Sequence, residues 1–141
     1  MRDLNELAQE IHDNAVAHGW WDKESHEVEV NGCGIGVSTE PSDRNPFEVL
    51  ALIHSEVSEV LEDLRKGFDP ADLHFEVKGE QGLSRKYVPG AKPCGVPSEM
   101  ADIIIRVLDA CAAWGIDIEQ AMALKMDYNI NRPYRHGDKR A

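Results

Sequence analysis

The sequence has no long run of hydrophobic residues and relatively few basic ones. No uninterrupted apolar segment approaches the ~18 residues that are needed to cross a lipid bilayer. The chain of 141 residues carries 15 Lys and Arg against 26 Asp and Glu, a net charge of −11 with His taken as neutral. Such a charge argues against general electrostatic binding to nucleic acid or to an anionic membrane. It suits a protein that binds cations, provided that some of its carboxylates converge.

Cysteine is also scarce, which excludes a disulfide framework. The three cysteines, Cys33, Cys94 and Cys111, are an odd number without paired spacing. We therefore expect reduced thiols in a cytoplasmic protein. Zinc sites need Cys or His ligands at short fixed spacings, which the sequence lacks. The first residues, 1–6, have no apolar signal core.

Helical periodicity predicts four principal helices in one domain that spans residues 1–141. The predicted helices cover residues 3–18, 45–66, 98–114 and 117–131. Asn45 and Pro46 are suited to begin the second of them, and Asp117 with Gln120 forms a capping box for the fourth. The second carries one apolar stripe, from Leu50 to Leu64. The third is apolar on nearly every face, which predicts that it is buried at the centre of the fold.

The segments between the helices are predicted to be loops. Four prolines and four glycines exclude a continuous helix over residues 68–97, so a long irregular loop is expected there. Residues 22–44 also look irregular, with a short strand or hairpin at 27–30. Residues 133–141 form a basic tail. The predicted fold class is all-α: a bundle of four to five helices with two loop insertions.

Two acidic pairs carry the main chemical signal. Glu56 and Glu59 lie in the second predicted helix, and Glu99 and Asp102 lie in the third. A spacing of three residues places both carboxylates of a pair on one helix face, with Cβ atoms roughly 5–6 Å apart. If the two helices pack antiparallel, the four carboxylates face each other and repel. Mg²⁺ or Mn²⁺ relieves such repulsion, because these ions prefer oxygen ligands.

The alternative interpretation is that these acids only form solvated helix faces, which is common for this spacing. Glu56 argues against it, because it borders the apolar stripe. Asp102 also argues against it, because it lies among apolar neighbours and an unpaired buried carboxylate is costly. Arg106, four residues after Asp102, offers a purely structural ion-pair partner.

A basic set follows in the fourth predicted helix. Lys125, Asn129 and Arg132 fall on one face and suit a polyphosphate on the side away from the metal. The alternative is a basic C-terminal turn that complements the helix dipole. Trp20 and Trp21 suit either stacking on a nucleobase or covering the end of the bundle. Because adjacent side chains cannot both enter one core, one of the two is expected at a pocket mouth or an interface.

Taken in order, these segments resemble a known superfamily. Glu56-Val-Ser-Glu59 followed by Glu99-Met-Ala-Asp102 resembles the E-x-x-E and E-x-x-D motifs of the all-α nucleoside triphosphate pyrophosphohydrolases, which include MazG proteins, dimeric dUTPases and dCTP pyrophosphatases. Residues 125–132, Lys-Met-Asp-Tyr-Asn-Ile-Asn-Arg, are similar to the K-x-x-Y-N-x-x-R segment of MazG-like members. The 39 residues between Glu59 and Glu99 exceed the usual separation, so the base-contacting region is not transferred.

The resemblance implies metal-dependent hydrolysis of a nucleoside triphosphate to the monophosphate and pyrophosphate, and we expect the substrate to be a deoxy or non-canonical nucleotide. It implies that the four acids bind Mg²⁺, with Mn²⁺ as an alternative, and carry catalysis. The implied substrate-binding residues are Lys125, Tyr128, Asn129 and Arg132, and the capacity for stacking adds Trp20 and Trp21 as further candidates. A homodimer or homotetramer is expected, without membrane or nucleic-acid partners. The competing hypotheses are a non-catalytic helical nucleotide-binding module and an oligomerisation module.

Overall fold

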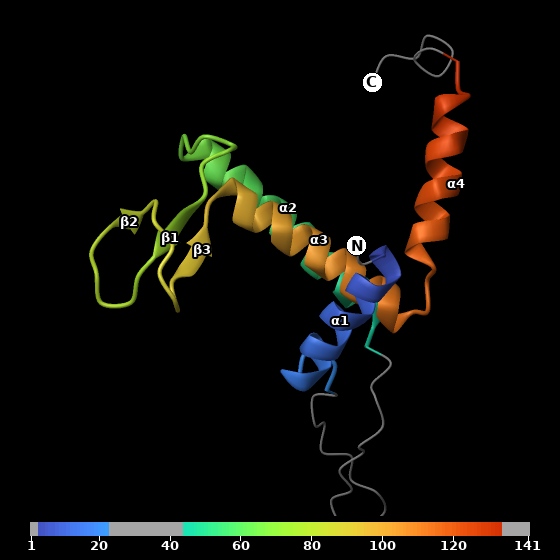
Figure 1. Cartoon of the computed structure of the whole chain (residues 1–141), viewed down its shortest axis with the longest axis horizontal. Helices are drawn as coiled ribbons and strands as arrows, with labels where there is room; N and C mark the ends of the chain where they lie inside the picture. Colours follow the sequence, from blue (N-terminus) through green and yellow to red (C-terminus); the bar gives the residue numbers. More distant parts are fainter. Residues whose placement is uncertain (1–2, 23–43, 134–141) are drawn as a thin grey trace, which may run out of the picture.

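The computed structural model describes residues 3–22 and 44–133, which form four helices and one small sheet (Figure 1). In chain order the elements are α1 (Leu4–Ala17), α2 (Pro46–Arg65), β1 (His74–Glu76), β2 (Leu83–Ser84), β3 (Lys92–Cys94), α3 (Val96–Ala113) and α4 (Ile118–Ile130). The strand expected at 27–30 and most of the basic tail lie outside the described residues.

The four predicted helices are confirmed, and local capping explains three of their starts. The side chain of Asp3 accepts a hydrogen bond from the Glu6 amide, that of Asn45 from the Phe47 amide, and that of Asp117 from the Gln120 amide. These bonds satisfy amides that have no partner within the first turn of a helix. α3 begins two residues earlier than predicted, with Gly95 at its N-cap in a left-handed conformation (φ 93°).

The prediction of an irregular loop over residues 68–97 was wrong, because this segment contains a three-stranded antiparallel sheet. The strand order is β2-β1-β3, and Phe75 pairs with Ser84 on one side and Pro93 on the other. Each strand has two or three residues, too few to show the period-two alternation that identifies strands. The all-α prediction is therefore confirmed only in its coarse form. The fold is mostly helical, and we call residues 74–94 the sheet arm.

The helices pack as a layer with α3 in the middle. α2 runs antiparallel to α3 along one side, and α1 packs on the other side of α3 (Figure 1). The buried cluster where they meet is small and consists of Trp21, Val49 and Ala110, with Ala15 and Ala113 packed against it. α1 and α2 thus reach the same central helix from two directions, which brings the end of α1 close to the start of α2.

The expectation of a fully buried third helix was wrong for one of its faces. Met100 and Ile104 of α3 are exposed, and so are Leu50 and Leu61 from the apolar stripe of α2. A single layer of helices leaves one side of α2 and α3 uncovered, so apolar residues there face solvent. Among the described residues no large side chain is fully buried.

α4 stands apart from this layer. Figure 1 shows it extending away from the end of α3, and none of its residues is buried. Its first turn is held to α1 by Asn5, whose side chain bonds Asp117 Oδ1 (2.8 Å) and accepts from the Ile118 amide (3.1 Å). No helix in the described part of the chain is both long and apolar enough to span a membrane.

Candidate metal centre

Three of the four predicted acids converge between α2 and α3. One carboxylate oxygen from each of Glu56, Glu59 and Glu99 lies within 4.8 Å of the other two. The antiparallel packing of the two helices produces this, since each spacing of three residues points its side chains toward the same junction. Glu56 is buried, with 7% of its surface exposed, while Glu59 is exposed and Glu99 is half-buried.

Asp102, the fourth predicted acid, lies next to this group but not within it. Its side chain is exposed, so the sequence-based argument that it sits in an apolar environment was wrong. It reaches solvent through an open cavity, which it lines together with Glu56 and Arg106. It remains close enough to Glu56 and Glu99 to interact with both electrostatically.

Burial and mutual repulsion shift the pKa values of two of these carboxyl groups. Partial removal from water raises the pKa of Glu99, and the charges of Glu59, Asp102, Asp63 and Glu56 raise it further. Partial desolvation also raises the pKa of Asp102, as does Glu56, while Arg106 and Lys92 oppose the rise. The site therefore carries more negative charge than its own surroundings neutralise.

Arg106 neutralises one member of the cluster. Its Nε donates to Glu56 Oε1 at 2.5 Å, so it pairs with Glu56 on α2 rather than with Asp102 on its own helix. Sequence spacing suggested the i,i+4 pair, but the guanidinium points across the α2–α3 junction instead. One oxygen of Glu56 is thereby engaged, and its second oxygen is left for another cation.

The residues fit a small, hard cation. Mg²⁺ binds oxygen at about 2.0–2.1 Å, so opposite ligands of one ion lie about 4 Å apart. The three carboxylate oxygens, all within 4.8 Å of each other, need only small side-chain movements to reach that geometry. Carboxylates are the ligands that Mg²⁺ and Mn²⁺ prefer. Desolvation and neighbouring negative charges raise the pKa values of Glu99 and Asp102. A bound cation would offset both effects.

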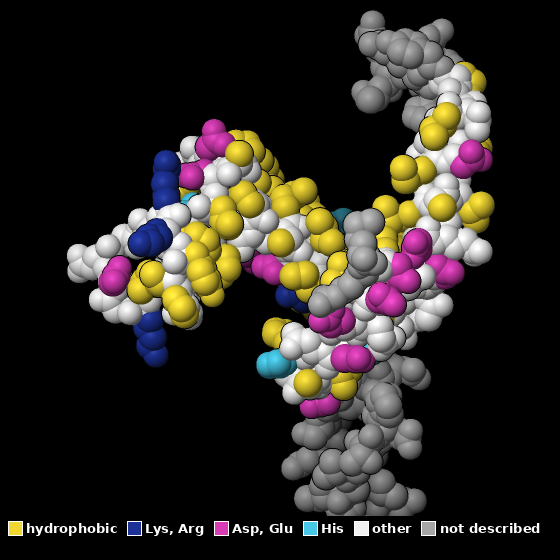
Figure 2. Space-filling model, viewed as in Figure 1, with side chains coloured by type: hydrophobic (Ala, Val, Ile, Leu, Met, Phe, Trp, Pro, Cys, Tyr) yellow, Lys and Arg dark blue, Asp and Glu magenta, His cyan; other side chains and the backbone are white. Residues whose placement is uncertain are grey.

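A cavity of about 680 Å³ opens beside the acids, between α1 and the α2–α3 pair. Figure 2 shows a hollow between the sheet arm and α1, in which acidic and basic side chains are visible. The cavity is lined by Glu56, Asp102 and Arg106 on the acid side, and by Asn14 and Trp20 on the other. This volume is within the range of pockets that hold small-molecule ligands.

The two tryptophans separate into one structural and one cavity residue. Trp21 is buried, and its Nε1 donates to both oxygens of Asp109, at 2.9 and 3.0 Å. His12 Nδ1 contacts the same carboxylate at 2.7 Å and meets the Trp21 ring edge-on. Trp20, by contrast, is 57% exposed and lines the cavity, with the Arg106 guanidinium 5.9 Å from its ring centre. The expectation that only one of the two enters the core is confirmed.

The predicted cationic set is not brought to the acids within one chain. Lys125 and Asn129 lie on α4, and Arg132 lies two residues beyond its end. Among the described elements, the main contact of α4 is with α1, near the start of α4. Lys125 and Arg132 instead flank the ring of Tyr128, each 5.4 Å from its centre. Within the described residues, none of these four lines the cavity. Their role in substrate binding stays a prediction.

The sequence indicated Asp109 only as a further acid on the Asp102 side, and it assigned no role to several other residues around the cavity and the acids. His12 and Asp109 fix Trp21, Arg44 donates to the Trp20 carbonyl at 2.8 Å, and Lys92 acts on Asp102 from the sheet arm. For Asp109 the signal was a second acid one heptad after Asp102. Lys92 begins a stretch, residues 92–102, that resembles a MazG-like subgroup, but no role could be assigned to it because the pairing of β3 with β1 decides where it lies. Comparisons with protein-family models, curated proteins and solved structures found no match.

Proposed function

We propose that this protein is a metal-dependent pyrophosphohydrolase that converts a nucleoside triphosphate to the monophosphate and pyrophosphate. The observation that carries the proposal is the convergence of Glu56, Glu59 and Glu99 from two antiparallel helices. The resemblance of the two acidic motifs and of residues 125–132 to MazG-like enzymes supports the same function. The alternative is a helical module that binds a nucleotide, or another copy of itself, without turnover.

In this proposal each part of the site has a distinct task. Glu56, Glu59 and Glu99 hold the cation. When bound, Mg²⁺ polarises the phosphoryl oxygens and lowers the pKa of a water molecule. Asp102, exposed and beside the three-carboxylate group, is placed to accept the proton of the attacking water.

The cavity suits the nucleoside half of such a substrate. Trp20 offers a flat ring for stacking, and Asn14 offers a donor and an acceptor for a base edge. Glu56 and Asp102 line the acid end of the same cavity, so a base near Trp20 directs its phosphates toward the acids. A deoxynucleotide or a non-canonical nucleotide is the substrate class we propose to test first.

We also propose that the active form is a homodimer or homotetramer. Large apolar residues are exposed on the outer faces of α2 and α3 and all along α4, including Leu61, Ile104 and Leu124. Burying such residues against a second copy supplies the hydrophobic contact that the single layer lacks. The basic side chains of α4 then have an acidic site within reach on the other copy, which gives Lys125 and Arg132 their phosphate-binding role.

The decisive experiment for the function is a panel of nucleoside triphosphates with Mg²⁺, assayed for pyrophosphate. In ¹⁸O-labelled water, the label should enter the monophosphate and not the pyrophosphate, because attack occurs at the α-phosphorus. Release of orthophosphate with accumulation of diphosphate would contradict the proposal. Nucleotide binding with no product from any member of the panel would favour the non-catalytic module.

Two variants on α2 provide a matched control for the site. Glu59→Gln should abolish turnover and leave helicity intact. Glu62→Gln should matter little, because Glu62 is exposed and pairs with Arg65 at 3.1 Å, away from the cluster. Equal losses in both variants would mean that the acidic face of α2 acts only through its overall charge.

The assembly has its own test, light scattering coupled to gel filtration. The wild-type chain should elute as a dimer or tetramer, and Leu124→Glu should shift it toward monomer. Glu119→Gln, on the same helix, should leave the oligomeric state of the wild type unchanged. A monomeric wild-type protein at micromolar concentration would contradict the proposed assembly but would leave the proposed hydrolase function unaffected.

A further inference from the structure

The basic side chains near the acidic helices are nearly all engaged. Arg106 bonds Glu56, Arg65 pairs with Glu62 at 3.1 Å, and Lys66 Nζ lies 3.4 Å from Asp63. A phosphate that enters the site finds these cations already neutralised. Lys125 on α4 and Arg132 just after it do not line the cavity beside these acids.

Lys92 is the exception. It is exposed, it opens β3, and it forms no ion pair with any carboxylate in the described part of the chain. Its cross-strand neighbour in the sheet is Glu76, yet the two do not come within ion-pair distance. It is nevertheless close enough to Asp102 to affect that carboxyl group electrostatically.

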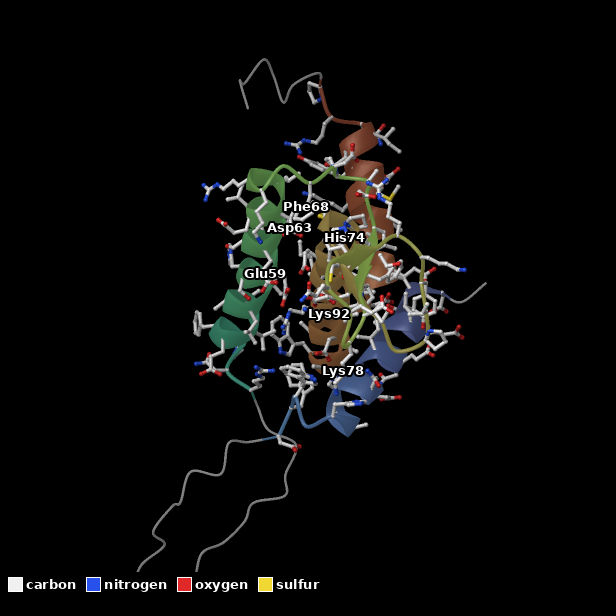
Figure 3. All side chains as sticks on the ribbon, turned by 90° about the vertical axis from the view of Figure 1, so that its left-hand side faces the viewer. Glu59, Asp63, Phe68, His74, Lys78 and Lys92 are labelled. Carbon is white, nitrogen blue, oxygen red and sulfur yellow. The ribbon has the colours of Figure 1, made fainter. Side chains whose placement is uncertain are left out.

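The backbone under Lys92 is held in place from two sides. β3 pairs along its length with β1, and it packs against α3, which begins only two residues after it. Gly95 makes the junction so tight that an added Cβ would lie 2.7 Å from the Asp72 carbonyl oxygen. Figure 3 looks onto this side and shows Lys92 in front of α3, facing the space between the sheet arm and Glu59 of α2.

We propose that Lys92 is a substrate-binding residue, which holds a phosphate oxygen of a polyphosphate bound at the metal centre. The sheet arm then has a function: it carries an ammonium group to the edge of an acidic site where Arg106, Arg65 and Lys66 are each already paired with a carboxylate. An ammonium group acts as a compact, mobile positive charge and suits an anion whose negative charge is shared over several oxygens. Before the anion arrives, the same charge lies beside Asp102 and opposes the entry of a metal cation.

Because Lys92 is proposed both to attract the phosphate and to oppose the entry of the metal ion, its removal should change the two affinities in opposite directions. The inference rests on the proposed function for the identity of the ligand, so the probe is inorganic tripolyphosphate in excess Mg²⁺, measured by calorimetry on the full chain. Lys92→Gln should weaken tripolyphosphate binding on the order of tenfold or more, the typical value of one hydrogen bond to a charged group. It should also strengthen binding of Mg²⁺ alone, because a repelling charge is lost. Lys92→Arg should retain most of the tripolyphosphate affinity.

Lys86→Gln is the matched control, because Lys86 follows β2 at the opposite edge of the same sheet. It should leave both affinities within about twofold of wild type, since Lys86, unlike Lys92, is not among the charges that act on Asp102. Equal effects of the two substitutions, parallel loss of Mg²⁺ and tripolyphosphate binding in Lys92→Gln, or no binding of tripolyphosphate by the wild type would each overturn the inference. A wild type that binds tripolyphosphate through Lys92 but hydrolyses no nucleotide would overturn only the proposed function.

Discussion

Arg106 Nε lies 2.5 Å from Glu56 Oε1 and joins α3 to α2 at the most buried carboxylate of the protein's acidic cluster. The same guanidinium lies over the ring of Trp20, so it contacts the acid cluster and the cavity at once. A buried carboxylate needs a cation nearby, and in the metal-free chain Arg106 supplies it. Metal binding adds a second cation to the same carboxylate.

Arg106→Met should therefore destabilise the metal-free protein more than the metal-bound one. Loss of the guanidinium leaves Glu56 buried without its partner, a cost of about 1–3 kcal/mol in the free energy of unfolding. Saturating Mg²⁺ should recover part of this loss, since the ion takes over the compensation. Urea denaturation with and without Mg²⁺ measures both values. An equal deficit under the two conditions would show that Glu56 does not bind the metal.

Glu56→Gln is the control for that experiment. The amide oxygen still accepts from Arg106, so the metal-free stability should change by less than about 1 kcal/mol. The stabilisation by Mg²⁺ should fall sharply, because a charged ligand is lost. A Glu56→Gln protein that gains as much stability from Mg²⁺ as the wild type would remove Glu56 from the ligand set.

Mg²⁺ affinity and metal-free stability should depend on pH in opposite directions. The folded-state pKa values of Glu99 and Asp102 lie above their ordinary values of 4.5 and 3.8. Over the window between those ordinary values and the raised ones, the folded chain binds more protons than the unfolded chain. The free energy of unfolding without metal therefore falls as pH rises through this window, by at most about 1.4 kcal/mol per pH unit for each proton.

Protons compete with the metal for the same oxygens, so Mg²⁺ affinity should increase with pH through that window and then level off. Thermal melts at several pH values, with and without Mg²⁺, measure both trends. Glu99→Gln should flatten the metal-free trend and raise metal-free stability above the window. A metal-free stability that instead rises with pH there would mean that the two carboxyl groups are not under repulsive strain.

The two adjacent tryptophans should respond differently to substitution. Trp21→Phe keeps an aromatic ring but makes it smaller and removes the donor to Asp109, which should lower the free energy of unfolding by at least about 1–3 kcal/mol. Trp20→Ala should leave stability within about 0.5 kcal/mol, since the side chain is mostly exposed, and should weaken nucleotide binding. Chemical denaturation and a nucleotide titration distinguish the two roles. Stability losses of the same size would mean that Trp20 is also a packing residue.

Gly95→Ala should displace the sheet arm. An added Cβ would meet the Asp72 carbonyl oxygen at 2.7 Å and His74 Cε1 at 2.8 Å, and φ is already 93°. Gly90→Ala is a matched control, because Gly90 has φ 83° but no atom within 4 Å of an added Cβ. Both variants should lose about 1 kcal/mol from backbone strain, and Gly95→Ala should lose more through the clash. Equal unfolding midpoints would show that the junction between β3 and α3 is not tightly packed.

The sequence was informative wherever the relevant interactions are local. Asn45, Pro46 and Asp117 mark helix starts through hydrogen bonds and backbone angles that involve only their neighbours. The acid spacing, too, needs only the pitch of a helix, so the shared faces of Glu56 with Glu59 and of Glu99 with Asp102 could be predicted before the helices were placed. That α2 and α3 pack antiparallel was only a condition of this argument, and the tertiary structure supplied it.

Interactions between distant parts of the chain were decided by the tertiary structure. Strands of two or three residues are too short to carry a period, so the sheet arm and the position of Lys92 come from cross-strand pairing. The choice of Glu56 over Asp102 as the partner of Arg106 depends on how α2 lies against α3, and the burial of Trp21 rather than Trp20 depends on Asp109, 88 residues away. Helical pitch and capping act over one or two turns and are determined by the sequence alone, whereas these contacts exist only once packing has fixed which helix faces meet.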